Sequence, residues 1–271
     1  MRKPFLLIIA TMLLATWGVA NTQAESPSDA SASPVTYEVT FDSTWSPTSH
    51  PTDYPSSAHY SRLVGTTHND TITLWREGDL ATNGIRLVAE FGANSTLESE
   101  VNAHIANGDA YSWIYGSSLW PGVGQIIHEF DTDATKPYVS LVSMIAPSPD
   151  WIVGVDSLDL QDASGEWIQT ITLDAFPYDA GTDSGMSYGS GNAPTVPYEP
   201  IANITGEPPL SNQRFGTFTF ELQTVPTAVS LNSTSTTSTS TLPLVLVTLI
   251  TLGIASLTLT QKKATVTIHA E

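Results

Sequence analysis

The alternation of apolar and polar residues is the clearest pattern in the middle of the chain. Residues 35–42 read Val-Thr-Tyr-Glu-Val-Thr-Phe-Asp, so that every second side chain is apolar. A period of two is typical of a strand with one buried face and one solvated face. Residues 138–145 are almost continuously apolar instead, which favours a central strand. The remaining segments that the pattern predicts as strands are 71–76, 125–130, 151–155, 167–173 and 216–222.

Two other segments have the spacing of short helices. Residues 84–91 form the first and residues 96–106 the second. Ser95-Thr-Leu-Glu98 reads as a capping box for the second helix, and Gly108 stands where its C-cap is expected. The apolar stripe of the second helix consists of Leu97, Val101 and Ile105.

The number and order of these segments predict the fold class. Strands outnumber helices, and they lack the spacing of βαβ units. We therefore expect a mainly β fold, an antiparallel β-sandwich with one or two short helices, over residues 35–222. A segment of this length is long enough to bury one hydrophobic core without disulfides.

The two ends of the chain carry targeting patterns. Residues 1–24 combine basic residues, a short apolar run and small residues, as in a secretory signal peptide cleaved after Ala20 or Ala24. Residues 242–260 are uncharged and, at about 1.5 Å per residue, just long enough for a transmembrane helix. The lysines of the tail, residues 261–271, favour a cytoplasmic C-terminus. A glycolipid-anchor signal is the second possibility, although such signals normally end in their apolar tail.

Composition adds a stalk and an acidic surface to this picture. Residues 223–241 are dominated by Ser and Thr, have almost nothing to bury, and predict a solvated stalk. The chain has 9 basic and 27 acidic residues and a formal charge of −18, which excludes tight nucleic-acid binding. It has no cysteine, which excludes disulfides, cysteine-ligated metals and thiol catalysis. An exported surface this acidic attracts divalent cations.

Three aspartates are the candidate metal ligands. Asp150 follows a strand in a proline-rich turn, and Asp179 and Asp183 lie four apart with Gly181 between them. Carboxylates that share a loop cluster repel each other unless a cation or hydrogen-bond donors separate them. Calcium takes oxygen ligands of this kind. The alternative is that each aspartate hydrogen-bonds nearby backbone as a turn residue, which is the common role of Asp in Gly/Ser-rich loops.

Several distinctive motifs follow one another along the chain. They are Ala-Pro-Ser-Pro-Asp-Trp-Ile-Val-Gly-Val-Asp at 146–156, Tyr-Asp-Ala-Gly-Thr-Asp-Ser-Gly at 178–185 and Asn-Ala-Pro-Thr-Val-Pro at 192–197, with further characteristic segments at 45–55 and 59–69. The chain resembles the spondin N-terminal (F-spondin) domain family, as a single-domain, Cys-free, membrane-tethered member. The resemblance implies a C2-like β-sandwich that binds Ca²⁺ at one end, with Asp150, Asp179 and Asp183 at the positions of the family's calcium carboxylates.

Three functional hypotheses follow. The first is an extracellular, membrane-tethered, calcium-binding module for adhesion or surface recognition of a cell-surface, matrix or glycan partner, without enzymatic activity. The second is a metal-dependent envelope hydrolase that uses the same carboxylates to activate water. The third is a structural surface protein whose aspartates are merely solvated.

His50, His59 and His68, spaced nine apart, are a weaker metal-site candidate, because such histidines more often form hydrogen bonds with loop backbone.

Overall fold

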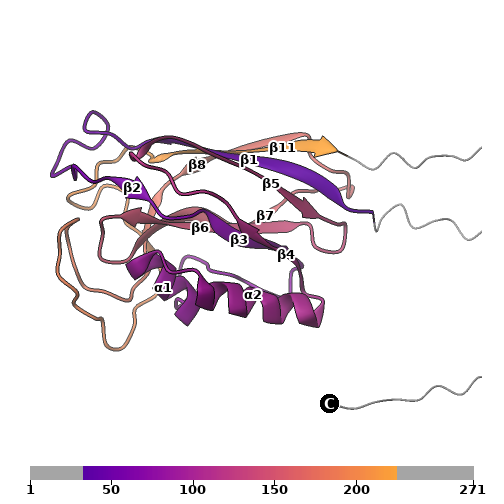
Figure 1. Ribbon diagram of the computed structural model, residues 1–271, viewed down its shortest axis with the longest axis horizontal. Coiled ribbons are helices and arrows are strands. Elements are labelled where there is room, and N and C mark those ends of the chain that lie inside the picture. Colours follow the sequence, from indigo (N-terminus) through magenta and orange to yellow (C-terminus); the bar gives the residue numbers. More distant parts are fainter. Residues whose placement is uncertain (1–32, 225–271) are drawn as a thin grey trace, which may run out of the picture. The chain divides into compact units, whose positions relative to one another are not determined.

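The computed structural model describes residues 33–224, and in them two antiparallel sheets and two helices form three layers. The four-stranded sheet packs on one face of a seven-stranded sheet, and both helices cover the other face (Figure 1). The predicted mainly β sandwich with two short helices is confirmed. The predicted signal peptide, transmembrane helix and tail lie outside the described residues, and so does the predicted stalk apart from residues 223–224, which end the last strand. Within residues 33–224, no helix is long and apolar enough to cross a membrane.

Strand order follows from antiparallel pairing throughout. The four-stranded sheet runs β5 (Val123–Thr132), β1 (Val35–Thr44), β11 (Gly216–Thr224) and β8 (Thr170–Ala175). The seven-stranded sheet runs β10 (Ala202–Asn203), β9 (Pro177–Asp179), β7 (Trp151–Asp159), β6 (Tyr138–Ala146), β3 (Val64–His68) and β4 (Ala110–Tyr115), and β2 (His59–Tyr60) also pairs with β6. The helices are α1 (Asn83–Phe91) and α2 (Ser95–Asn107).

The apolar pattern of each strand matches its layer. In β1 every second side chain is buried, because only one face of its sheet is covered. In β6 every residue after Tyr138 is buried, because the other sheet covers one face and the helices cover the other. Leu141 accordingly belongs to the core between the sheets, whereas Val142 belongs to the core beneath the helices. The continuously apolar run that predicted a central strand thus has a direct physical cause.

Aromatic rings dominate the core between the sheets. Phe41 of β1 stacks on Phe218 of β11 with ring centroids 4.6 Å apart, and it meets Tyr60 edge-on at 5.0 Å. Trp45, which is fully buried, extends this cluster toward the end of the sandwich where the β6–β7 turn lies. Burial of a large side chain of this kind stabilises the fold by about 1.5–3 kcal/mol relative to leaving it exposed.

The helices begin differently from the prediction. Thr82 caps α1, because its Oγ1 accepts a hydrogen bond from the Ile85 amide at 3.1 Å. The capping box predicted for the second helix is wrong. That helix begins at Ser95 after Asn94, whose side chain makes no capping bond. The expected C-cap is present, since Gly108 is left-handed with φ +84°.

Two predicted strands need correction. Residues 71–76 form no strand; Leu74 and Trp75 are buried instead in the core beneath the helices. The Trp75 indole donates to the carbonyl of Leu141 at 3.0 Å, so side-chain packing rather than strand pairing produced the apolar pattern. The segment 167–173 is displaced, because β8 begins only at Thr170.

Sequence patterns also missed a buried strand. All five residues of β3 are buried, although three of them are polar. Their side chains are satisfied internally, for example by the bond from Thr66 Oγ1 to the Ser112 carbonyl at 2.8 Å. A strand whose polar groups are paired inside the fold has no alternation for sequence analysis to detect.

Candidate metal centre

Strand pairing brings two of the three predicted ligands together. Asp150 directly precedes β7, and Asp179 ends β9, which pairs with β7 so that Trp151 lies opposite Asp179. The Ala180 amide donates to the Asp150 carbonyl at 3.1 Å and continues this ladder past Asp179. The loop that follows β9 carries Asp183. All three aspartates therefore belong to one cluster at the end of the β7–β9 pair.

Gly181 determines how this loop folds back. Its φ is +73°, and a Cβ at this position would lie 2.0 Å from the carbonyl oxygen of Glu199. The Glu199 amide donates to the Gly181 carbonyl at 2.9 Å, which closes the loop between them. Gly181 thus makes the tight curl between Asp179 and Asp183 possible, because its left-handed φ and its close approach to Glu199 leave no room for a side chain. The same closure brings Glu199 to the cluster.

The Asp150 carboxylate is completely buried but only half satisfied. Its Oδ2 accepts hydrogen bonds from the Thr182 amide at 2.7 Å and the Asp183 amide at 3.0 Å. Its Oδ1 is buried and accepts no hydrogen bond from the described residues. An unsatisfied buried carboxylate oxygen costs free energy in the folded protein.

The other two carboxylates also accept bonds from loop amides. Asp179 Oδ1 accepts from the Gly181 amide at 2.7 Å. Asp183 Oδ1 accepts from Gly185 at 2.8 Å, and its Oδ2 accepts from Ala193 at 2.8 Å. The turn-residue role weighed in the sequence is therefore present in the structure. It does not exclude cation binding, because each carboxylate oxygen has more than one lone pair.

Burial and mutual repulsion raise the pKa values of this cluster. Burial, and secondarily the charge of Asp179, raises the pKa of Asp150 to about 7. Burial also raises the pKa of Asp179, to which the charges of Glu199 and Asp183 add. Three backbone and side-chain donors on Asp150 lower its pKa but do not cancel the burial. The hydrogen-bond donors within the cluster therefore do not fully stabilise the ionised forms of these carboxylates.

This arrangement can accept a hard cation but is not a finished coordination shell. A cation beside Asp150 Oδ1 would pair the unsatisfied oxygen and offset the repulsion with Asp179. A cavity of about 350 Å³ lies next to the cluster and is lined by Asp179, Asp183 and Glu199 among others. Within residues 33–224, however, no three His, Cys, Asp or Glu side chains already stand in metal-binding geometry. Glu199 was missed in the sequence, because only the Gly181 closure brings it near.

The three histidines predicted as a weaker metal site, His50, His59 and His68, do not form one site. Each histidine has its own local environment and none shares a ligand set with another. The ring of His50 packs on Phe215 at 4.4 Å, the ring of His59 packs on Trp120 at 4.6 Å, and His68 Nε2 lies 2.8 Å from Ser140 Oγ. Burial lowers the pKa values of His50 and His68, which favours neutral rings inside the fold.

Fold and loop cluster together define a class: a β-sandwich domain with a helical outer layer and an acidic loop site at one end. The family model described as Spondin_N matches residues 35–226. The chain belongs to the spondin N-terminal domain family, and the resemblance inferred from its motifs is confirmed.

Several relatives show the same likeness. Spondin-2 of Rattus norvegicus is 37% identical over 153 residues, which is 56% of this chain and 46% of that protein. Spondin-2 of Homo sapiens is 38% identical over 153 residues, which again is 56% of this chain and 46% of that protein. Spondin-1 of Rattus norvegicus is 36% identical over 153 residues, or 54% of this chain and 19% of that protein. The chain therefore matches less than half the length of these relatives.

Proposed function

We propose that this protein is an extracellular, C2-like calcium-binding module that is tethered to the membrane and serves adhesion or surface recognition. The observation that carries the proposal is the fully buried Asp150 carboxylate, whose Oδ1 accepts no hydrogen bond from residues 33–224 and whose neighbours are also acidic. Membership of the spondin N-terminal family supports the same role. The signal peptide and transmembrane helix predicted from the sequence supply the export and the tether.

The donor set favours calcium over other metals. The available groups are carboxylate, carbonyl and hydroxyl oxygens, and the chain contains no cysteine. Oxygen-rich sites suit Ca²⁺ and Mg²⁺, and Ca²⁺ tolerates the irregular geometry of loop ligands better. Asp150, Asp179 and Asp183 would hold the ion, and the ion would join the end of β7 to the loop after β9. Its function would be to fix these loops as a preorganised surface for a cell-surface, matrix or glycan partner.

Metal removal tests this proposal. A ligand that binds only the folded state stabilises it by about 2.7 kcal/mol at one hundred times its dissociation constant. For a domain of this size, we expect calcium to raise the melting temperature of the full-length protein by about 5–10 °C over chelator. Asp179→Asn should abolish most of this shift, because it removes a ligand charge.

The matched control for this melt is Asp70→Asn, which makes the same chemical change at an exposed residue outside the cluster. This variant should keep the full calcium shift. If chelator leaves the wild-type melt unchanged, or if Asp70→Asn and Asp179→Asn lose the shift equally, the calcium proposal is wrong.

A further inference from the structure

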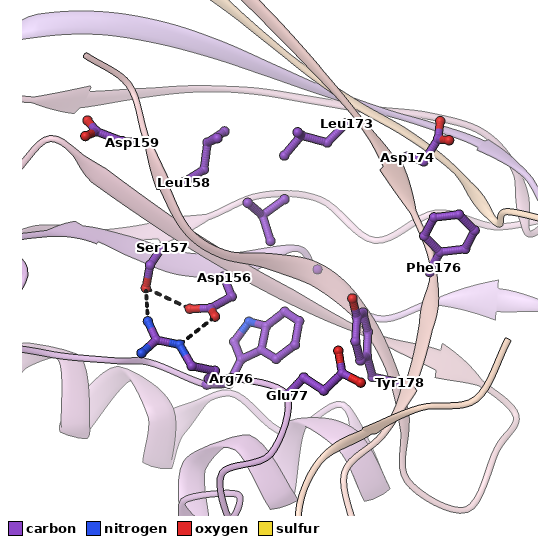
Figure 2. A pocket seen from close by; sticks show the side chains of 13 residues that line it. Arg76, Glu77, Asp156, Ser157, Leu158, Asp159, Leu173, Asp174, Phe176 and Tyr178 are labelled. Carbon is purple, nitrogen blue, oxygen red and sulfur yellow. Dashed lines mark hydrogen bonds and ion pairs between the residues drawn. The ribbon is translucent and has the colours of Figure 1, made fainter. Parts of the chain in front are cut away.

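A second site lies on the side of the sandwich, along an open strand edge. β9 pairs with β7 only from Trp151 to Val153. Beyond Val153, β7 continues to Asp159, and none of the described strands pairs with it on that side. β8 is likewise the outermost strand of its own sheet. A cavity of about 580 Å³ lies beside this open edge of β7 and reaches β8 (Figure 2).

The cavity wraps around the edge of β7. On the side of the helices it is lined by Trp75 and Tyr178, whose rings meet edge-on at 5.2 Å. On the side of the other sheet it is lined by Leu173 and Phe176 (Figure 2). A groove with apolar walls on both sides of a strand edge provides places for side chains that point alternately to the two faces of an added strand.

The chain path explains why the edge is open. β8 ends at Ala175 and the chain passes through Phe176 into β9, so it moves from one sheet to the other at this point. β9 then runs away from the second half of β7. The open edge consists of residues 154–159, and a bulge divides it at Ser157, whose φ is +45° and whose amide donates to Ser140 Oγ at 2.9 Å. An extended segment would pair with the regular part of this edge before Ser157, in the position that β9 occupies on the first half of β7, and would continue past the bulge along the cavity.

The charges on the rim select the kind of segment. Among the acidic lining residues, Asp156 is paired with Arg76 at 2.9 Å, and Asp174 is paired with Arg214 at 2.6 Å. Glu77 and Asp159 also line the cavity, and neither forms an ion pair with any of residues 33–224. Figure 2 shows Asp159 toward one end of the groove and Glu77 beside Tyr178 toward the other. These two carboxylates complement basic side chains and repel acidic ones.

We infer that this groove binds an extended, lysine- or arginine-bearing segment of a partner protein, which adds to the open edge of β7 as a further strand. Backbone hydrogen bonds to β7 would supply the affinity, and the apolar walls together with Glu77 and Asp159 would supply the preference for alternating apolar and basic residues. The site uses none of the three aspartates of the candidate metal centre. The inference therefore goes beyond calcium binding and does not depend on it.

A peptide titration on the full-length protein tests this inference. The probe is a fluorescently labelled octapeptide that alternates Lys and Val, with both ends blocked, and binding is followed by fluorescence anisotropy. Two further peptides separate the contributions: one has Glu in place of Lys, and one keeps the Lys/Val sequence but carries N-methyl groups on alternate backbone amides. The double variant Glu77→Gln/Asp159→Asn removes the unpaired rim charges. Its control is Glu129→Gln/Glu221→Gln, which makes the same change in charge on exposed positions of β5 and β11.

We expect saturable binding of the Lys/Val peptide, about tenfold weaker binding to Glu77→Gln/Asp159→Asn, and unchanged binding to the control variant. The Glu/Val and N-methylated peptides should bind at least tenfold more weakly than the Lys/Val peptide. A circular-dichroism melt of each variant checks that the fold is intact. The absence of saturable binding would overturn the inference. Equal weakening by the two double variants, or equal binding of the N-methylated peptide, would overturn it as well.

Discussion

At the scale of single residues, the defining feature is the conflict at Asp150. Its carboxylate is fully buried, and two backbone amides and a hydroxyl donate to one oxygen, while the other oxygen has no hydrogen-bond partner in the part of the chain that the structure describes. Proteins seldom bury a charge that is only partly paired, because desolvation costs several kcal/mol. The conflict is resolved when the group takes up a proton or when a cation binds. Both resolutions can be measured.

Protonation of Asp150 predicts an unusual pH dependence of stability in chelator. The pKa of this group is about 7 in the folded protein, against about 3.9 when unfolded, so the folded state holds the proton more tightly. Its contribution to stability is therefore complete below about pH 4 and is lost as pH rises through 7. Relative to Asp150→Asn, wild type should lose about 2–3 kcal/mol of unfolding free energy between pH 5 and pH 8.

Urea unfolding of both proteins in chelator at four pH values measures this difference. The comparison with Asp150→Asn is necessary because His50 and His68 titrate in the opposite sense, their pKa values being lowered by burial. Two stability profiles that run parallel from pH 5 to pH 8 would contradict the account of Asp150.

The sequence predicted Asp150, Asp179 and Asp183 as a group, and pairing of β7 with β9 places them in one cluster. Their motifs carried that prediction, because turn residues and spacing alone favoured the backbone-bonding role. Glu199 could not be predicted, since it reaches the cluster through a backbone contact with Gly181 that no local pattern records. Whether the cluster holds calcium stays a prediction.

At the scale of the elements, a side chain of α2 connects the two helices by accepting hydrogen bonds at the N-terminus of α1. Glu100 of α2 accepts hydrogen bonds from the Gly84 amide at 2.8 Å and from Thr82 Oγ1 at 2.7 Å. A carboxylate at this place satisfies an unpaired amide and complements the helix dipole. Capping here is thus partly supplied by a residue distant in sequence, which a search for local capping boxes does not find.

Removal of this contact should destabilise the helical layer. We expect Glu100→Ala to lower the unfolding free energy by about 1–2 kcal/mol, because it leaves the Gly84 amide without its partner. Glu98→Ala is the matched control in the same helix, since Glu98 is exposed and its side chain forms no hydrogen bond or ion pair with any of residues 33–224. Urea denaturation of the two variants measures the difference. Equal losses would mean that Glu100 does not link the helices.

The apolar pattern predicted strands correctly where it follows from the pairing and burial of a sheet. The alternation of residues 35–42 correctly indicated β1, and the apolar run at 138–145 correctly indicated β6. β3 was missed because its polar side chains are bonded inside the fold, and residues 71–76 were wrongly predicted because Leu74 and Trp75 pack without strand pairing. Apolar periodicity reports burial, and burial has causes other than a sheet.

At the scale of the whole described domain, three layers create two separate cores and two candidate surfaces. One core lies between the sheets and the other beneath the helices. The acidic loop cluster lies at the end of the β7–β9 pair, and the groove follows the second half of the same strand. β7 therefore positions both sites. The fold class was predictable from strand number and spacing, but the open edge of β7 depends on the passage from β8 to β9 between sheets.

The most direct test of the account is isothermal titration calorimetry of CaCl₂ into the full-length protein at pH 7.5, beside Asp150→Asn and Asp70→Asn. We predict saturable binding to wild type and to Asp70→Asn, and at least tenfold weaker binding to Asp150→Asn, because that change removes the buried charge. A wild-type protein that binds no calcium, or an Asp150→Asn variant that binds it as tightly as wild type, would contradict the central claim.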